Sequence, residues 1–170
     1  AENWEESGRE PEAARCLERA GDNARAAALY EHAGMWREAA ECHLRDERWT
    51  SAAEVFERAK DHPAAATYFE RSGNLEQAAE NRERGDDWDG AAALWERVGE
   101  RTREVKALEK AGRWAKAASI HEELGDQRKA SAAWRKGMRP DRSGRSRGLA
   151  MEEAERWADA AEAWAEIGEA

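Results

Sequence analysis

The sequence predicts an all-α fold: an α-solenoid of the right-handed type, built from about 12–13 short antiparallel helices. Three observations predict it. The 170 residues include 38 alanines, and 38% of them are charged, a composition that favours helix at nearly every position. A unit of 13 residues repeats along almost the whole chain. Within each unit, apolar residues recur with the spacing of one helix face.

The repeat units begin at Ala13 and follow at intervals of 13 residues as far as Ala130. Four additional residues come next, and further units then begin at Arg147 and Ala160. The nine tryptophans support this register, because all of them fall on two of the 13 positions. Position 5 holds Trp4, Trp95, Trp134 and Trp164, and position 11 holds Trp36, Trp49, Trp88, Trp114 and Trp157.

Each unit reads as one helix of about ten or eleven residues. Apolar or small residues stand at positions 1, 4, 5 and 8, and position 9 is usually glycine, which ends a helix in the left-handed conformation. Position 10 is often Asp or Asn, a good N-cap, and Pro11 and Pro63 fall in the first turn. Asn74 and Gln77 have the spacing of a capping box. The expected N-caps are Asp22, Asp61, Asn74, Asp87 and Asp126.

Helices this short are marginal alone in water, so their stability must come from packing on neighbours. Short joints make consecutive helices antiparallel, and two units form one helical hairpin. Paired alanines at positions 1 and 2 allow close approach of the helix axes, while large side chains fill the wider spaces. A stacking platform for a peptide or a base is the alternative role for the tryptophans. The predicted structural core contains Trp36, Trp49, Trp88, Trp95, Trp114, Trp134, Trp157 and Trp164.

The organisation predicted is one solenoid domain. The repeat array occupies 1–137, an arginine-rich loop is inserted at 138–148, and the array continues over 149–170. The chain starts without Met in the middle of a unit and stops where another unit would begin, so we expect a fragment of a longer protein. Neither end has the polar cap of a solenoid terminus, which leaves stacking of one copy on another as a further expectation.

The joint Gly34–Ala39 resembles the turn within a tetratricopeptide repeat, whose pattern is Gly-x-aromatic-x-x-Ala. Gly73–Ala78 and Gly112–Ala117 are similar to it. The chain therefore resembles a compact, tetratricopeptide-like α-solenoid, in which a hairpin of two units is shorter than the repeat of that family. The resemblance implies binding of proteins or peptides on a curved helical face, as one module of a larger chain.

No catalytic motif is present, so we expect no enzyme activity and no cofactor. Cys16 and Cys42 have no metal-ligand spacing and are expected to be reduced, buried thiols in a cytoplasmic protein. Zinc bound by these cysteines and His43 is the alternative. His43 and His121, both at position 5, are expected to pack in the core or at its boundary. No apolar run is long enough to span a membrane.

Two surface features have both a functional and a passive interpretation. The Glu-Arg pairs at positions 6 and 7 could form a charged ligand track, or a solvated face with intrahelical pairs such as Glu41–Arg45, Glu54–Arg58 and Glu80–Arg84. The inserted loop could hold an anionic group or be a passive surface loop. The partner-binding candidates in it are Arg139, Arg142, Arg145 and Arg147.

The function expected is that of a scaffold that binds a partner protein or peptide, as the recognition module of a larger signalling or defence protein. A self-associating structural module is the first alternative. A weak contact with an anion or nucleic acid through the arginine-rich loop is the second, although a net charge of −9 opposes general nucleic-acid binding.

Overall fold

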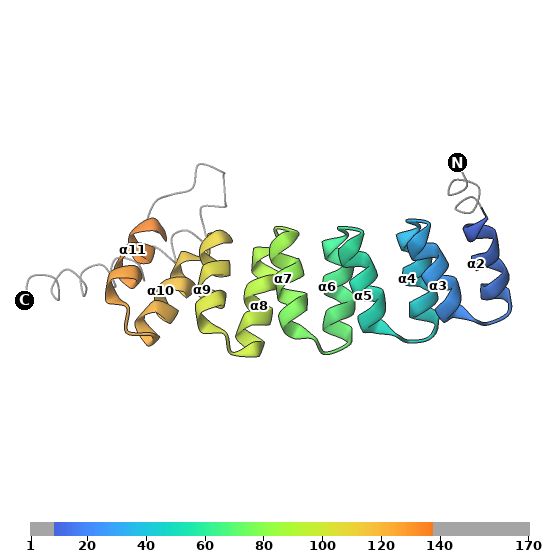
Figure 1. The fold of residues 1–170 in the computed structure, drawn as a ribbon. Helices are drawn as coiled ribbons and strands as arrows, with labels where there is room; N and C mark the ends of the chain where they lie inside the picture. The colour runs from blue at the N-terminus through green and yellow to red at the C-terminus, as the bar shows by residue number, and fades with distance from the viewer. Residues whose placement is uncertain (1–8, 138–170) are drawn as a thin grey trace, which may run out of the picture. The chain divides into compact units, whose positions relative to one another are not determined.

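A computed structural model describes residues 9–137 of the chain. Helices occupy 79% of these residues, and none of them lies in a strand (Figure 1), so the predicted all-α helical repeat is confirmed over this range. In chain order the ten helices are α2 (Glu10–Arg19), α3 (Asn23–His32), α4 (Trp36–Arg45), α5 (Trp49–Arg58), α6 (His62–Arg71), α7 (Leu75–Arg84), α8 (Trp88–Val98), α9 (Arg101–Lys110), α10 (Trp114–Glu123) and α11 (Gln127–Gly137).

Several sequence predictions fall outside the described residues. The inserted loop at 138–148 and the continuation of the array over 149–170 both lie there. The same holds for the tryptophans Trp4, Trp157 and Trp164 and for the arginines Arg139, Arg142, Arg145 and Arg147.

The register of the repeat sets the bounds of the helices. From Glu10 to Gln127, each helix starts one full repeat unit after the helix before it, at position 11 of the unit. Eight of the ten described helices end at position 7, and α8 and α11 continue to position 8. At those eight ends position 8 is the C-cap, and positions 9 and 10 form the joint.

Every described joint closes in the same way. In the joint between α3 and α4, the Gly34 amide donates to the Glu31 carbonyl at 3.0 Å, and the Met35 amide donates to the Tyr30 carbonyl at 2.8 Å. These two bonds form a Schellman motif, which needs a left-handed residue at position 9. Gly34 meets this need with a φ of 71°. At three joints a residue with a side chain takes the same conformation: Glu47 (φ 55°), Lys60 (φ 61°) and Asp86 (φ 58°).

The predicted N-caps are confirmed at the aspartates. Asp22, Asp61, Asp87 and Asp126 each accept a bond from the amide three residues later, at 3.0–3.2 Å. The prediction for Asn74 is wrong, because its side chain makes no capping bond. The Asn74 amide instead donates to the Thr50 hydroxyl at 3.4 Å and links α7 to α5.

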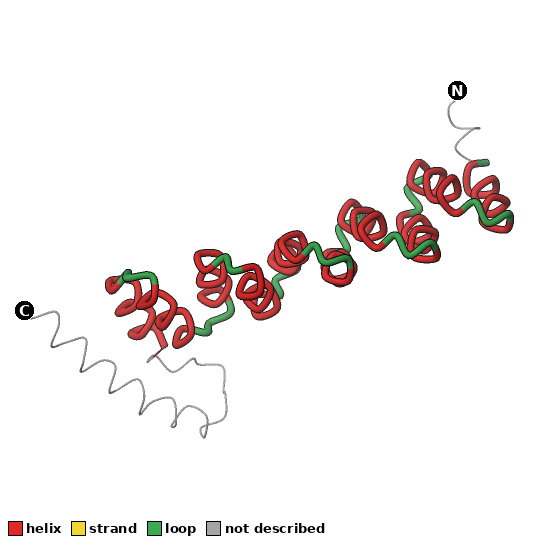
Figure 2. Tube along the Cα trace, turned by 90° about the horizontal axis from the view of Figure 1, so that it is seen from below, coloured by secondary structure: helices red, strands yellow, loops and turns green. Residues whose placement is uncertain are grey.

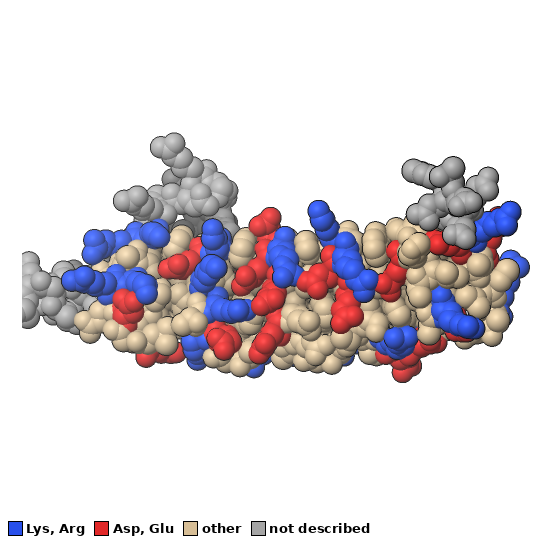
Figure 3. All heavy atoms as spheres, in the orientation of Figure 1, with Lys and Arg blue, Asp and Glu red and all other residues tan. Residues whose placement is uncertain are grey.

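The chain divides into two compact units, Ala1–Leu94 and Trp95–Ala170. In the first unit, the six helices from α2 to α7 pack in sequence, each on its neighbours within this set, and they alternate between two rows (Figure 2). In the second unit, α10 packs on both α9 and α11. On the face shown in Figure 3, acidic and basic side chains are interspersed in both units. None of the described helices has the length and the apolar character needed to cross a bilayer.

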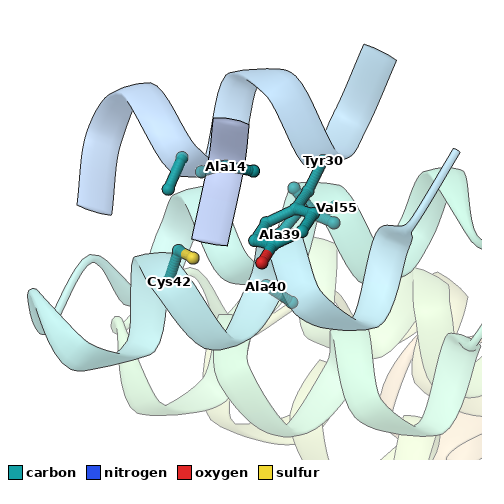
Figure 4. Packing of buried hydrophobic residues seen from close by; sticks show 8 residues of the cluster. Ala14, Tyr30, Ala39, Ala40, Cys42 and Val55 are labelled. Carbon is teal, nitrogen blue, oxygen red and sulfur yellow. The ribbon is translucent and has the colours of Figure 1, made fainter. Parts of the chain in front are cut away.

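Paired alanines at positions 1 and 2 form the centre of the packing. Ala26, Ala27, Ala39 and Ala40 are fully buried, for example, and the Tyr30 ring lies against this small-residue layer (Figure 4). Among the described tryptophans, Trp95 is buried. Those at position 11 open their helices, so their rings lie at helix ends and are half-buried. The half-buried tryptophans are Trp36, Trp49, Trp88, Trp114 and, at position 5, Trp134.

Candidate functional site

Several glutamates at position 6 contact the helix that follows their own. The Tyr30 hydroxyl donates to Glu18 at 2.7 Å, and the Trp134 indole N–H donates to Glu122 at the same distance. In each pair the partner stands at position 5 of the following helix. The buried rings of His43 and His121 face glutamates in the same way, with Nε2 at 3.3 Å from Glu31 and Glu109.

The same glutamates also reach the second helix along. Arg45 is paired with Glu18, Arg58 with Glu31 and Arg84 with Glu57, and in each pair the arginine lies two helices after the glutamate. Glu18 and Glu31 thus each contact three successive helices, counting their own, and we call this arrangement of position-6 glutamates the glutamate ladder. The predicted intrahelical pairs of Arg45 and Arg58 are wrong, because both guanidiniums bind these more distant carboxylates. Only the Arg84–Glu80 pair of the three predicted forms, at 3.8 Å.

The protonation of the ladder follows from its contacts. The hydrogen bond from Arg45, and then the one from Tyr30, lower the pKa of Glu18. Burial, followed by the hydrogen bond to Glu18, raises the pKa of Tyr30 to about 12. Glu18 is therefore a carboxylate and Tyr30 a phenol at neutral pH, and the bond between them is intact.

The glutamate ladder is interrupted at α4. Among the described helices, position 6 is Glu except at Leu44 and at Arg135 in α11. On α5, the helix after Leu44, position 5 is Phe56. Two apolar side chains, Leu44 and Phe56, therefore stand where the glutamate and its partner would be. Arg71, at position 7 two helices after Leu44, finds no carboxylate there and instead lies over the Trp49 ring at 3.8 Å.

Aromatic rings are aligned beside this interruption. The rings of Phe56 and Tyr68 are nearly parallel, with centroids 5.4 Å apart and planes at 9°. Tyr68 in turn is nearly parallel to Trp49, with centroids 6.3 Å apart and planes at 4°. The three rings form a row across α5 and α6, an arrangement that is favourable for offset aromatic pairs.

A groove of about 640 Å³ lies where the ladder is interrupted, and we call it the Leu44 groove. Residues of α4, α5 and α6 and of the joints beside them form it. Its apolar lining includes Met35, Trp36, Leu44, Phe56 and Tyr68, all half-buried. The volume lies within the range of about 300–1,000 Å³ that is common for ligand sites.

The polar lining of the Leu44 groove is mostly acidic. Glu38, Glu41 and Asp61 contribute three carboxylates, and Arg37 contributes one guanidinium, so the formal charge is −2. The Asp61 carboxylate caps α6. Glu38 and Glu41 form no hydrogen bond or ion pair with any other residue in the range 9–137, and the same is true of the Tyr68 hydroxyl and the indole N–H of Trp36. The groove therefore presents acceptors and donors that the described fold does not use.

One hairpin further along, the equivalent positions carry charges. Glu70 and Arg82 replace Leu44 and Phe56, and Asp87 replaces Asp61, each two repeat units later. Arg82 donates to Glu70 at 3.1 Å and to Asp87 at 2.5 Å, so that its guanidinium lies between the two carboxylates. We call this the Arg82 cluster. Gly90 makes room for it, because a Cβ there would lie 2.7 Å from Arg82 Nη1.

Other buried polar groups are held within the fold. Asn81 donates to Glu57 and to the Gln77 carbonyl at 3.2 and 3.0 Å, and its carbonyl oxygen lies 3.1 Å from His62 Nδ1. Glu104, which stands where most units have alanine, binds Arg101 at 2.9 Å. These contacts leave the Leu44 groove as the candidate site.

The sequence predictions for cysteine and histidine are met in part. His43 and His121 are buried, as expected for packing residues. Cys42 is buried, as expected, but Cys16 is exposed, so the expectation for Cys16 is wrong. No group of three or more His, Cys, Asp or Glu side chains within the described range is arranged to hold a metal ion.

Sequence reasoning missed the Leu44 groove, although one signal for it was available. In the 13-residue register, Leu44 is an apolar residue at a position that is otherwise almost always charged. The predicted site residues lie elsewhere: the four arginines of the loop fall outside the described residues. Trp36, assigned to the core, is half-buried and lines the groove.

No protein-family model matches the chain, and no curated protein matches it either.

Proposed function

We propose that the chain is a non-enzymatic protein-interaction module that binds a peptide segment of a partner protein in the Leu44 groove. One observation carries the proposal: at this point apolar side chains and unused polar groups replace the contacts that close the surface elsewhere. Aromatic and aliphatic side chains beside a few polar groups are what a peptide-binding groove requires.

We further propose that the array is tetratricopeptide-like, acts as the recognition module of a larger signalling or defence protein, and works in the cytoplasm. Helix joints that resemble the turn of that family, with Gly34 in the left-handed conformation, support the first point. The free thiols of Cys16 and Cys42 are compatible with the last.

A graft variant tests the proposed function. It combines Leu44→Glu, Phe56→Arg and Ala64→Gly, which copy Glu70, Arg82 and Gly90 from one hairpin later. These substitutions fill the groove with an ion pair whose geometry the fold already contains. We therefore expect the graft variant to fold, with a circular dichroism spectrum like that of the wild type.

The measurement is selection of a random dodecapeptide phage library on the wild type and on the graft variant. Peptides selected on the wild type should bind it with a Kd of about 1–100 μM and bind the graft variant at least about tenfold more weakly. Trp36→His, which copies His62, serves as a second variant if the graft variant does not fold. Peptides that bind the wild type and a folded groove variant equally well would contradict the proposal.

Self-association through the chain ends and anion binding by the arginine-rich loop stay predictions. Both depend on residues outside 9–137, so the observation that favours the Leu44 groove does not extend to them.

A further inference from the structure

The charge of the Leu44 groove restricts its partner, if the groove binds a peptide as proposed above. We propose that the partner segment is basic, with an aliphatic or aromatic anchor in the groove and a Lys or Arg beside Glu38 and Glu41. This inference rests on the proposed function and adds the chemistry of the ligand to it.

The anchor follows from the apolar floor. Leu44 and Phe56 occupy the two positions that hold a carboxylate and its donor in the flanking hairpins, and the Tyr68 ring extends this surface. A polar side chain placed there would lose its hydration without gaining a partner from either Leu44 or Phe56. An aliphatic or aromatic side chain would bury apolar surface instead.

The cation follows from two carboxylates at the rim. Glu38 and Glu41 are three residues apart on α4, so their side chains lie on the same face of this helix. Neither forms a hydrogen bond or an ion pair with another residue of the described part of the chain. The hydrogen bond to Glu18 raises the pKa of Arg45, and only a weaker attraction to Glu41 adds to this shift. If residue 44 were a glutamate, the glutamate ladder would pair it with Arg71. Because residue 44 is leucine, Arg71 instead lies over the Trp49 ring. A Lys or Arg of a bound peptide would supply the missing positive charge.

An acidic peptide fits this surface poorly. Arg37 is the single cation among the residues that line the groove, and it stands beside Glu38 in the chain. Three carboxylates would repel an anionic ligand or the phosphates of a nucleic acid. Charge complementarity therefore selects a basic segment over an acidic one.

The test uses Glu38→Gln/Glu41→Gln, which removes both charges and keeps the shape of the groove. Glu12→Gln/Glu54→Gln is the matched control, because these exposed glutamates occupy the same two positions of other units, outside the groove. Library peptides selected on the wild type should be rich in Lys and Arg and contain an aliphatic or aromatic residue. The best of them should bind the first variant about 5–20-fold more weakly and the control unchanged, by calorimetry at 50 mM salt.

The outcomes separate the two proposals. If the selected peptides are neutral or acidic but still bind the wild type more tightly than the graft variant, the proposal of a basic partner is wrong and the proposed function stands. Peptides that bind the wild type and the graft variant equally would overturn both. A synthetic peptide of residues 138–148 that competes with the selected peptides is one contrary result, and a dimer in light scattering that the graft variant abolishes is another. Either result would mean that the groove binds a segment of this chain, and the proposal of a separate partner would be wrong.

Discussion

The Leu44 groove and the Arg82 cluster are the same place in two consecutive hairpins, and three of the side chains that differ between them decide whether the space is open or filled. Leu44, Phe56 and Ala64 leave an open apolar groove, whereas Glu70, Arg82 and Gly90 fill the equivalent space with an ion pair. The helices on which these residues lie begin at the same position of the repeat. Substitutions at positions 5 and 6 can therefore turn a filled space into an open groove without a shift in where the helices begin.

A hairpin earlier, Glu18 and Tyr30 occupy these positions and are joined by a hydrogen bond. The Leu44 groove is thus flanked on both sides by polar versions of itself. This comparison indicates that binding capacity in the repeat is created by removing polar contacts, since the flanking hairpins fill the same space with the Glu18–Tyr30 hydrogen bond and the Glu70–Arg82 ion pair.

Truncation at the two equivalent positions should give the largest effect on stability. Phe56→Ala removes a ring that packs on Tyr68 and lines the groove beside Leu44, and we expect a loss of about 2–3 kcal/mol in the free energy of unfolding. Arg82→Ala should cost about 1–2 kcal/mol, because it leaves Glu70 and Asp87 without their shared cation on a partly exposed surface. Urea unfolding of the two variants provides the measurement.

Salt distinguishes the two losses. The cost of Arg82→Ala should shrink between 0.05 and 1 M salt, whereas that of Phe56→Ala should not, because screening acts on ion pairs and not on aromatic packing. Equal salt dependence at both positions would break the comparison. The double variant Glu70→Leu/Arg82→Phe serves as a control, because it copies Leu44 and Phe56. Its free energy of unfolding should fall by less than that of Arg82→Ala.

Glycine substitutions in the joints that precede α6 and α8 should have a smaller effect on the free energy of unfolding than the truncations, and they should stabilise the protein. Lys60 and Asp86 hold the left-handed conformation with φ of 61° and 58°, where glycine is free of strain. Each change to glycine should add about 0.5–1 kcal/mol to stability, and the gain should be greater at Lys60, since Asp tolerates this conformation better than Lys. Thermal unfolding measures it. Gly73→Ala, at a φ of 86°, should lower the melting temperature, and a rise there would refute the argument.

The pH dependence of the Glu18–Tyr30 pair should give the smallest effect. The folded pKa of Glu18 lies below its unfolded value of about 4.3, so its contribution is present above that pH and is lost as the pH falls through the folded pKa. The folded pKa of Tyr30, at about 12, lies above its unfolded value, so its contribution is lost as the pH rises beyond about 10. The stability difference between the wild type and Glu18→Gln should therefore be greatest near neutral pH and shrink at pH 3.

Urea unfolding at pH 3, 7 and 11 measures this difference, with Tyr30→Phe as the probe of the alkaline side. Leu44 and Phe56, the equivalents of Glu18 and Tyr30 one hairpin later, cannot titrate. Substitutions at these two residues should therefore change the stability by the same amount at every pH. A constant difference between wild type and Glu18→Gln from pH 3 to 7 would contradict the assigned pKa direction.

The sequence predicted the repeat well because the signals for the helices are local. Glycine at position 9 and aspartate at position 10 act within one joint, and both the Gly34 turn and the Asp22 cap form as expected. Asn74 departs from the prediction because a hydroxyl on another helix, that of Thr50, competes for its side chain.

The candidate site was not predictable in the same way. Pairs such as Arg45–Glu18 join residues on alternate helices, and periodicity alone gives neither the distance between the two helices nor the direction of the side chains. The intrahelical partner Glu41 is equally available in the sequence. Leu44 could have been noticed as an exception to the register, but its meaning depends on Phe56 and Tyr68, which the fold brings beside it.

The contacts of the position-6 glutamates have a consequence for how the first unit unfolds. In an array coupled through adjacent helices alone, melting can proceed one helix at a time. A carboxylate that holds its own helix, the next one and the one after that extends this coupling, so that groups of three helices lose their order together. At Leu44 this coupling between alternate helices is missing, and we infer that hydrogen exchange will find its lowest cooperativity between α4 and α6. A ligand that contacts all three of these helices would restore the coupling, and its presence would be detectable as a sharper unfolding transition.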